Sequence, residues 1–137
     1  MQAPIQSTIT LIVEIVIAVI IFFIIYRAYV QNVFMRRLAF FAIAYETIFN
    51  IGYMVFRSMH PSSGILTTSM KMVGAMHGIL SLVIFIAVIV IFLKANKANK
   101  MGENYFKKHF VVTFLFILGW IISLLSGSWL YWASYYR

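Results

Sequence analysis

The chain has 137 residues, of which 64% are hydrophobic and 10% are charged, and it contains no cysteine. This composition lies outside the range of water-soluble domains and predicts an integral membrane protein with one domain, residues 1–137. The lack of cysteine excludes disulfides, thiolate metal sites and cysteine nucleophiles. The formal net charge of +8 does not indicate nucleic-acid binding, because the basic residues lie in short segments between apolar runs.

Four apolar segments are long enough to cross a bilayer, at about residues 9–28, 38–57, 73–93 and 110–133. A hydrocarbon core of about 30 Å requires roughly 20 helical residues. Runs such as LIVEIVIAVIIFFIIY and ILSLVIFIAVIVIFL are apolar all round, whereas helices of a soluble bundle keep a polar face. The sequence therefore predicts an all-α integral membrane protein, a four-transmembrane-helix antiparallel bundle.

Basic residues are distributed unevenly between the two sides of this predicted bundle. Eight lie in or beside the first and third connections, and three lie on the other side: Arg27, Arg36, Arg37, Lys94, Lys97, Lys100, Lys107 and Lys108 against Arg57, Lys71 and Arg137. The positive-inside rule then places both termini outside the membrane. We expect a multi-pass protein of a prokaryotic plasma membrane, with KANKANK (residues 94–100) as a solvated inner loop that contacts anionic lipid.

Aromatic residues gather where the last predicted helix ends, in SWLYWASYYR. The cluster comprises Trp129, Tyr131, Trp132, Tyr135 and Tyr136. Amphipathic rings settle at the level of the lipid headgroups. We therefore interpret this cluster as an anchor at the outer membrane interface rather than as a binding cage.

Polar side chains recur along one face of the second predicted helix. Successive members are four, three, four and three residues apart: Glu46, Asn50, Tyr53, Arg57 and His60. A charged side chain that faces lipid near the bilayer centre costs about 2.5–3.5 kcal/mol. This stripe is therefore expected to face the bundle interior or a partner protein.

Glu14, on the first predicted helix, lies at a depth similar to that of residues 50–57, and we expect an ion pair between Glu14 and Arg57.

Three interpretations stay open for Glu46 and Asn50: buried polar contacts that fix helix packing, an interface with a partner, and a proton path. A single mid-membrane carboxylate without a second relay group does not carry protons across a membrane, which disfavours the proton path.

Small residues predict close contacts between the later helices. Gly74 and Gly78 form a small-xxx-small pair that lets two backbones approach. Further small or polar residues on the third and fourth predicted helices extend this pattern: His77, Ser81, Gly119, Ser123, Ser126 and Gly127. We interpret them mainly as packing residues.

His60 and His77 lie at the outer ends of the second and third predicted helices, whereas about 30 Å of bilayer separates them from His109. Imidazole and thioether ligands suit copper, so this pair is a candidate copper site, with the adjacent Met59 and Met76 as further candidate ligands. The alternative is that these residues cap helix ends and meet a partner. Haem b is disfavoured, because His60 stands beside a proline at a helix end.

The last predicted helix starts at His109 and continues with Trp120, Ser126-Gly127 and Tyr131. Together with His60 and His77, this pattern resembles the domain of unknown function 420 family of small four-span membrane proteins. That family has Thr at the position of Ser126. The family's histidine at the start of the second span has no counterpart, since Arg36 and Arg37 occupy that region. A second metal or haem site is therefore in doubt.

Some relatives in that family are assembly factors for haem-copper oxidases, so the resemblance implies a helper rather than an enzyme. We expect a non-catalytic accessory subunit or assembly factor that packs, through its intramembrane polar face, against a larger membrane metalloenzyme, either a haem-copper oxidase or a membrane copper monooxygenase. The alternative is a small copper-binding or haem-binding membrane protein that uses His60 and His77. A transporter or channel is disfavoured, since the second half does not repeat the first in inverted form. A membrane enzyme is disfavoured as well, because the acids and histidines form no arrangement that specifies a reaction.

Overall fold

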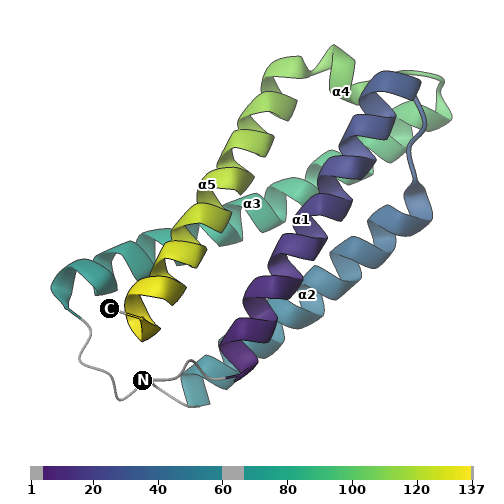
Figure 1. The fold of residues 1–137 in the computed structure, drawn as a ribbon. Helices are drawn as coiled ribbons and strands as arrows, with labels where there is room; N and C mark the ends of the chain where they lie inside the picture. The colour runs from purple at the N-terminus through teal and green to yellow at the C-terminus, as the bar shows by residue number, and fades with distance from the viewer. Residues whose placement is uncertain (1–4, 60–66, 137) are drawn as a thin grey trace.

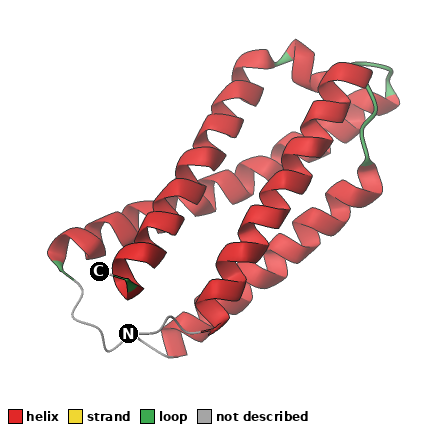
Figure 2. Cartoon of the chain, viewed as in Figure 1, coloured by secondary structure: helices red, strands yellow, loops and turns green. Residues whose placement is uncertain are grey.

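The computed structural model describes residues 5–59 and 67–136, without the side chains of residues 56–58. These residues fold into helices and connecting loops, and the described part contains no strand (Figures 1 and 2). The helices are α1 (Ile5–Gln31), α2 (Arg36–Met59), α3 (Thr68–Lys100), α4 (Tyr105–Lys108) and α5 (Phe110–Tyr135). The prediction of an all-α protein is confirmed for this part of the chain.

Four of these helices are long and apolar enough to cross a membrane: α1, α2, α3 and α5. This confirms the prediction of a multi-pass membrane protein. Each helix extends beyond the predicted apolar segment. At about 1.5 Å per residue, the 33 residues of α3 reach well past a hydrocarbon core of about 30 Å.

The segment KANKANK was wrongly predicted as a loop, because it forms the last two turns of α3. Ala95 and Ala98 are buried, whereas Lys94, Lys97 and Lys100 are exposed. The three-residue repeat thus keeps alanine on the packed side of the helix and lysine on the solvent side. Alanine also has the highest helix propensity, so the repeat favours a helix that continues past the apolar run.

The end of α3 is set by Gly102, which has a left-handed backbone with φ 77°. The amide of Gly102 donates to the carbonyl of Asn99 at 3.1 Å, and that of Glu103 donates to the carbonyl of Ala98 at 2.9 Å. These two bonds form a Schellman motif, the common way to satisfy the last carbonyl groups of a helix. Glycine takes this conformation without steric cost.

The long helices form a ring in which α1 and α3 each contact α2 and α5. Hydrogen bonds join the start of α1 to the end of α5, from Ser7 to Tyr135 at 3.3 Å and from Thr8 to Tyr131 at 2.6 Å. Successive long helices run in opposite directions (Figure 1). The first turns of α1 and α3 therefore lie at the same end as the last turns of α2 and α5, and we call this the cavity end.

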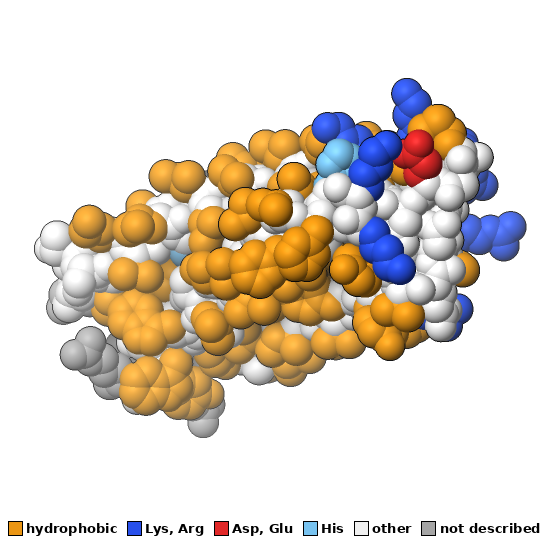
Figure 3. Space-filling model, turned by 90° about the horizontal axis from the view of Figure 1, so that it is seen from above, with side chains coloured by type: hydrophobic (Ala, Val, Ile, Leu, Met, Phe, Trp, Pro, Cys, Tyr) orange, Lys and Arg blue, Asp and Glu red, His pale blue; other side chains and the backbone are white. Residues whose placement is uncertain are grey.

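We call the opposite end, with α4 and the α1–α2 connection, the basic end, since exposed lysine and arginine side chains gather there (Figure 3). Phe34 packs edge-to-face on Phe92, with ring centroids 5.6 Å apart, and Phe106 lies beside it. The buried apolar cluster comprises Ile17, Ala18, Ile21, Ile24, Ile25, Ala28, Ala39, Ala42, Ile84, Val88, Ile91, Phe92, Ala95, Phe106, Phe116 and Trp120. These residues lie in the middle of the molecule and at the basic end.

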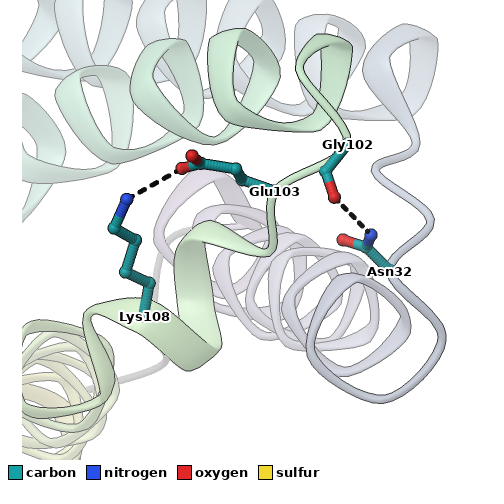
Figure 4. Close-up of polar contacts among 4 residues, drawn as sticks. All are labelled: Asn32, Gly102, Glu103 and Lys108. Atoms are coloured by element: carbon teal, nitrogen blue, oxygen red, sulfur yellow. Dashed lines mark hydrogen bonds and ion pairs between the residues drawn. The ribbon is translucent and has the colours of Figure 1, made fainter.

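Asparagine side chains tie the two connections of the basic end together. Asn32 has a left-handed backbone with φ 54°, which asparagine tolerates better than most residues. Its side-chain amide donates to the carbonyl of Gly102 at 3.3 Å (Figure 4), and Asn99 donates to the carbonyl of Asn32 at 3.0 Å. The exposed Glu103–Lys108 ion pair, at 2.9 Å, lies beside this junction and adds little stability.

Asn104 connects α4 to the last turn of α1. Its side-chain amide donates to the carbonyl groups of Ala28 at 2.8 Å and Tyr29 at 3.0 Å. Its side-chain oxygen accepts from the amide of Lys107 at 3.1 Å, as the N-cap of α4. One residue therefore satisfies the open carbonyl end of one helix and the open amide end of another.

Candidate functional site

A polar cavity of about 420 Å³ lies at the cavity end, between α1, α2, α3 and α5. Most of its lining is polar or aromatic: Ser7, Thr10, Leu11, Glu14, Tyr53, Met70, Lys71, Gly74, His77, Gly127, Leu130, Tyr131, Ser134 and Tyr135. We refer to this space as the polar cavity. It is the candidate functional site, because ligand sites in proteins are concave spaces with a few converging polar groups.

Helix positions give the depth of each group in the polar cavity. Glu14 lies seven residues after Ser7 on α1, which corresponds to about 10 Å along the helix axis. His77 lies six residues after Lys71 on α3, or about 9 Å further from the cavity end. Glu14 and His77 are therefore the deepest polar groups in this cavity, and Lys71 lies near its mouth.

Two smaller cavities adjoin the polar cavity, and Glu14 lines all three. One has a volume of about 30 Å³ and is also lined by Glu46, Asn50, Ser81 and Trp120. The other has a volume of about 10 Å³ and is also lined by Glu46 and Asn50. The two glutamates of the predicted membrane spans thus border the same small spaces, Glu14 from α1 and Glu46 from α2.

Glu46 and Asn50 of the predicted polar stripe are half-buried, whereas Tyr53 is exposed. Glu46, Asn50 and Tyr53 all line the cavity of about 10 Å³ beside α1. The Asn50 side chain donates to the carboxylate and to the backbone carbonyl of Glu46, both at 3.0 Å. Glu46 and Asn50 are therefore bonded to each other along α2, and their role stays open. The side chain of Arg57 and all of His60 lie outside the described residues, so the Glu14–Arg57 ion pair stays a prediction.

His77 joins α3 to α5 through a chain of hydrogen bonds. Ser126 donates its hydroxyl proton to the carbonyl of Ser123 at 2.9 Å, so it accepts from Nδ1 of His77, also at 2.9 Å. Nε2 lies 3.4 Å from the hydroxyl of Ser81, which in turn bonds to the hydroxyl of Ser123 at 2.8 Å. This arrangement places a proton on Nδ1 and leaves Nε2 with one long contact.

Two glycines of α5 give α3 the room to pack closely. A Cβ atom added at Gly119 would lie 2.6 Å from Cδ1 of Ile84, and one added at Gly127 would lie 2.9 Å from Cε1 of His77. The imidazole thus packs directly over the backbone of α5. The prediction that glycines mediate close helix contacts holds for these two positions.

The Gly74/Gly78 pair does not make the close helix contact that was predicted for it. A Cβ atom added at either glycine would have no neighbouring atom of the described residues within 4 Å. The reason is that α3 approaches α5 through its His77 and Ile84 side, whereas Gly74 borders the polar cavity. A glycine pair permits close packing but does not determine which face a neighbouring helix uses.

The candidate metal ligands do not gather around His77. Met59 and Met76 are 71% and 64% exposed, and neither lines the polar cavity, whereas Met70 does. Because His60 lies outside the described residues, the paired site of His60 and His77 stays a prediction. His109 lies at the basic end, as expected, with its ring 4.6 Å from that of Tyr105.

The aromatic cluster at the end of α5 has two parts. Trp129, Trp132 and Tyr136 are exposed, as expected for residues at a membrane interface. Tyr131 and Tyr135 instead bond to α1 and line the polar cavity. The interpretation of the whole cluster as an anchor was therefore wrong for these two residues. Tyr131 and Tyr135 are four residues apart and so share a helical face, and this spacing could have indicated that both face the same neighbouring helix.

No family model, curated protein or solved structure matches this chain. The resemblance to the domain of unknown function 420 family stays a prediction that rests on the residues quoted for it.

Proposed function

We propose that the four long helices form an antiparallel membrane bundle in a prokaryotic plasma membrane, with the basic end in the cytoplasm. The asymmetry of lysine and arginine supports this orientation, with eight of these residues on the basic side and three on the other. Both termini and the polar cavity then lie on the outer side. The exposed Trp129 and Trp132 would mark the outer interface.

We propose further that this protein is a non-catalytic accessory subunit or assembly factor of a larger membrane metalloenzyme. The metalloenzyme is either a haem-copper oxidase or a membrane copper monooxygenase, as the family resemblance implies. One observation supports a partner: the cavity-end halves of α2 and α3 have a surface on which no described residue packs. Ile51, Gly52 and Met54 of α2 are exposed, and a Cβ atom at Gly52 or Gly78 would meet nothing within 4 Å.

Small residues on an open helix surface have a particular meaning in a membrane. Lipid tails are as apolar as leucine, so helices associate through close packing, and small residues permit that packing. In this reading, a transmembrane helix of the larger subunit packs on α2 and α3 beside Gly52 and Gly78. The polar stripe is not part of this surface, because Glu46 and Asn50 border the small cavity beside α1.

Enlarging the two glycines tests this proposal. The variant Gly52→Leu/Gly78→Leu should fold like the wild type, because both positions have room in the isolated chain and leucine favours a helix over glycine. The matched control is Val83→Phe, which enlarges an exposed residue on a different face of α3. After native purification in mild detergent, stoichiometric large subunits that carry copper or haem should accompany the wild type and Val83→Phe, but not the glycine variant.

A lone chain in every preparation would contradict the accessory role. If that lone chain carried its own copper or haem, the second candidate function, a small copper-binding or haem-binding protein, would replace the first. The observation that favours this second function is the position of His77, which lines the polar cavity and whose Nε2 has only a long contact of 3.4 Å. Equal metal content in the wild type and in His77→Ala would exclude it.

A further inference from the structure

The polar cavity has the size of a site for a small organic molecule. Its volume of about 420 Å³ falls in the range of about 300–1,000 Å³ that is typical of ligand sites. One water molecule needs only about 10–15 Å³ of such space, which is the scale of the smaller cavities beside Glu14, of about 30 Å³ and 10 Å³. A ligand that fills the polar cavity therefore has several non-hydrogen atoms.

The deep part of the polar cavity favours positive charge. Glu14 lines it and, together with Glu46, borders the two smaller cavities, which no basic side chain of the described residues lines. Lys71, which also lines the polar cavity, lies near its mouth. Carboxylates within a membrane are costly unless a proton or a cation compensates them.

The side walls of the polar cavity carry aromatic and apolar groups. Tyr53, Tyr131 and Tyr135 line it, together with Leu11 and Leu130. The hydroxyl groups of Tyr131 and Tyr135 bond to the first turns of α1, which fixes their rings at the wall. Aromatic rings attract the diffuse positive charge of an ammonium group, and apolar side chains contact its carbon atoms.

We propose that the polar cavity binds a small organic cation of the alkylammonium class, with its positive charge beside Glu14. The cation then takes the place that the predicted Glu14–Arg57 ion pair would give to the guanidinium group. The carboxylate disfavours an anion, whereas the tyrosine rings and the volume disfavour a bare metal ion. This proposal does not rest on the accessory role, because every group it uses belongs to this chain and neither Gly52 nor Gly78 lines the polar cavity.

Calorimetric titration of the full-length chain in uncharged detergent micelles, with tetramethylammonium chloride as the probe, tests the proposal. We expect saturable binding of one cation per chain, and Glu14→Gln should weaken it by about tenfold or more. Sodium chloride tests for an inorganic cation, and tert-butanol tests for a neutral molecule of similar shape. Equal binding of either control, or unchanged binding in Glu14→Gln, would overturn the proposal.

A second variant separates loss of binding from loss of folding. Leu130→Trp fills the polar cavity but keeps Glu14, whereas Leu125→Trp makes the same change at a residue of α5 that is 65% exposed. Both variants should melt near the wild-type temperature, and only Leu130→Trp should lose tetramethylammonium binding. Wild-type affinity in Leu130→Trp would show that the cation binds elsewhere, which would also overturn the proposal.

Discussion

The basic end and the cavity end are held together by different interactions. At and near the basic end, apolar side chains such as Ile21, Ile24 and Val88 are fully buried, and asparagine side chains tie the connections together. At the cavity end, hydroxyl and imidazole groups join the helices around an open space. The same four helices therefore change from apolar packing to polar contacts along their length.

This difference indicates where the protein can hold functional groups. A polar cavity removes buried contacts and leaves carboxylates in a membrane, and both effects lower stability. The dense packing near the basic end fixes the helices, so the cavity end can keep such groups without loss of the fold. Functional regions are commonly found at the less stable end of a structure for this reason.

The largest expected effect is at the basic end, where Phe106→Ala should lower the free energy of unfolding by about 3–5 kcal/mol. Phe106 is 1% exposed and packs beside Phe34, so its removal leaves a cavity in dense surroundings. Leu130→Ala, at the wall of an existing cavity, should cost about 1 kcal/mol. Unfolding with a denaturing detergent in mixed micelles measures the free energy of unfolding of both variants. Equal losses of this free energy would contradict the proposed difference in packing between the basic end and the cavity end.

A smaller effect is expected at the cavity end, where Gly127→Ala should cost about 1 kcal/mol. The added Cβ atom would lie 2.9 Å from Cε1 of His77, so the ring must shift and lengthen its bond to Ser126. The same detergent titration, repeated in a His77→Ala background, tests the cause. The cost of Gly127→Ala should disappear there, whereas additive costs would show that the two residues do not interact.

The membrane spans were predictable from the sequence because a run of about 20 apolar residues has few other stable environments. The helical face that carries Glu46, Asn50 and Tyr53 was predictable for a similar reason, since residues three or four apart share a face of any helix. Both predictions depend only on positions within one segment of the chain.

The contacts between helices were not predictable in this way. The bond from Tyr131 to Thr8 joins residues 123 positions apart, and nothing in either segment specifies the other. The approach of Glu14 to the same small cavities as Glu46 also depends on how α1 and α2 rotate against each other. Gly74 and Gly78 show the opposite case. Their spacing is a local pattern that predicts close packing, but no described helix packs against them.

The smallest expected effect concerns the pH dependence of the basic end. Burial raises the pKa of the Tyr105 hydroxyl above its ordinary value of 10.0. Above that pH the unfolded chain loses this proton before the folded chain does, so Tyr105 makes stability fall as the pH rises. Tyr105→Phe should match the wild type near neutral pH and lose less stability in alkaline solution. Melting temperatures at matched ionic strength measure this, and parallel pH profiles would show that Tyr105 stays as accessible in the folded chain as in the unfolded one.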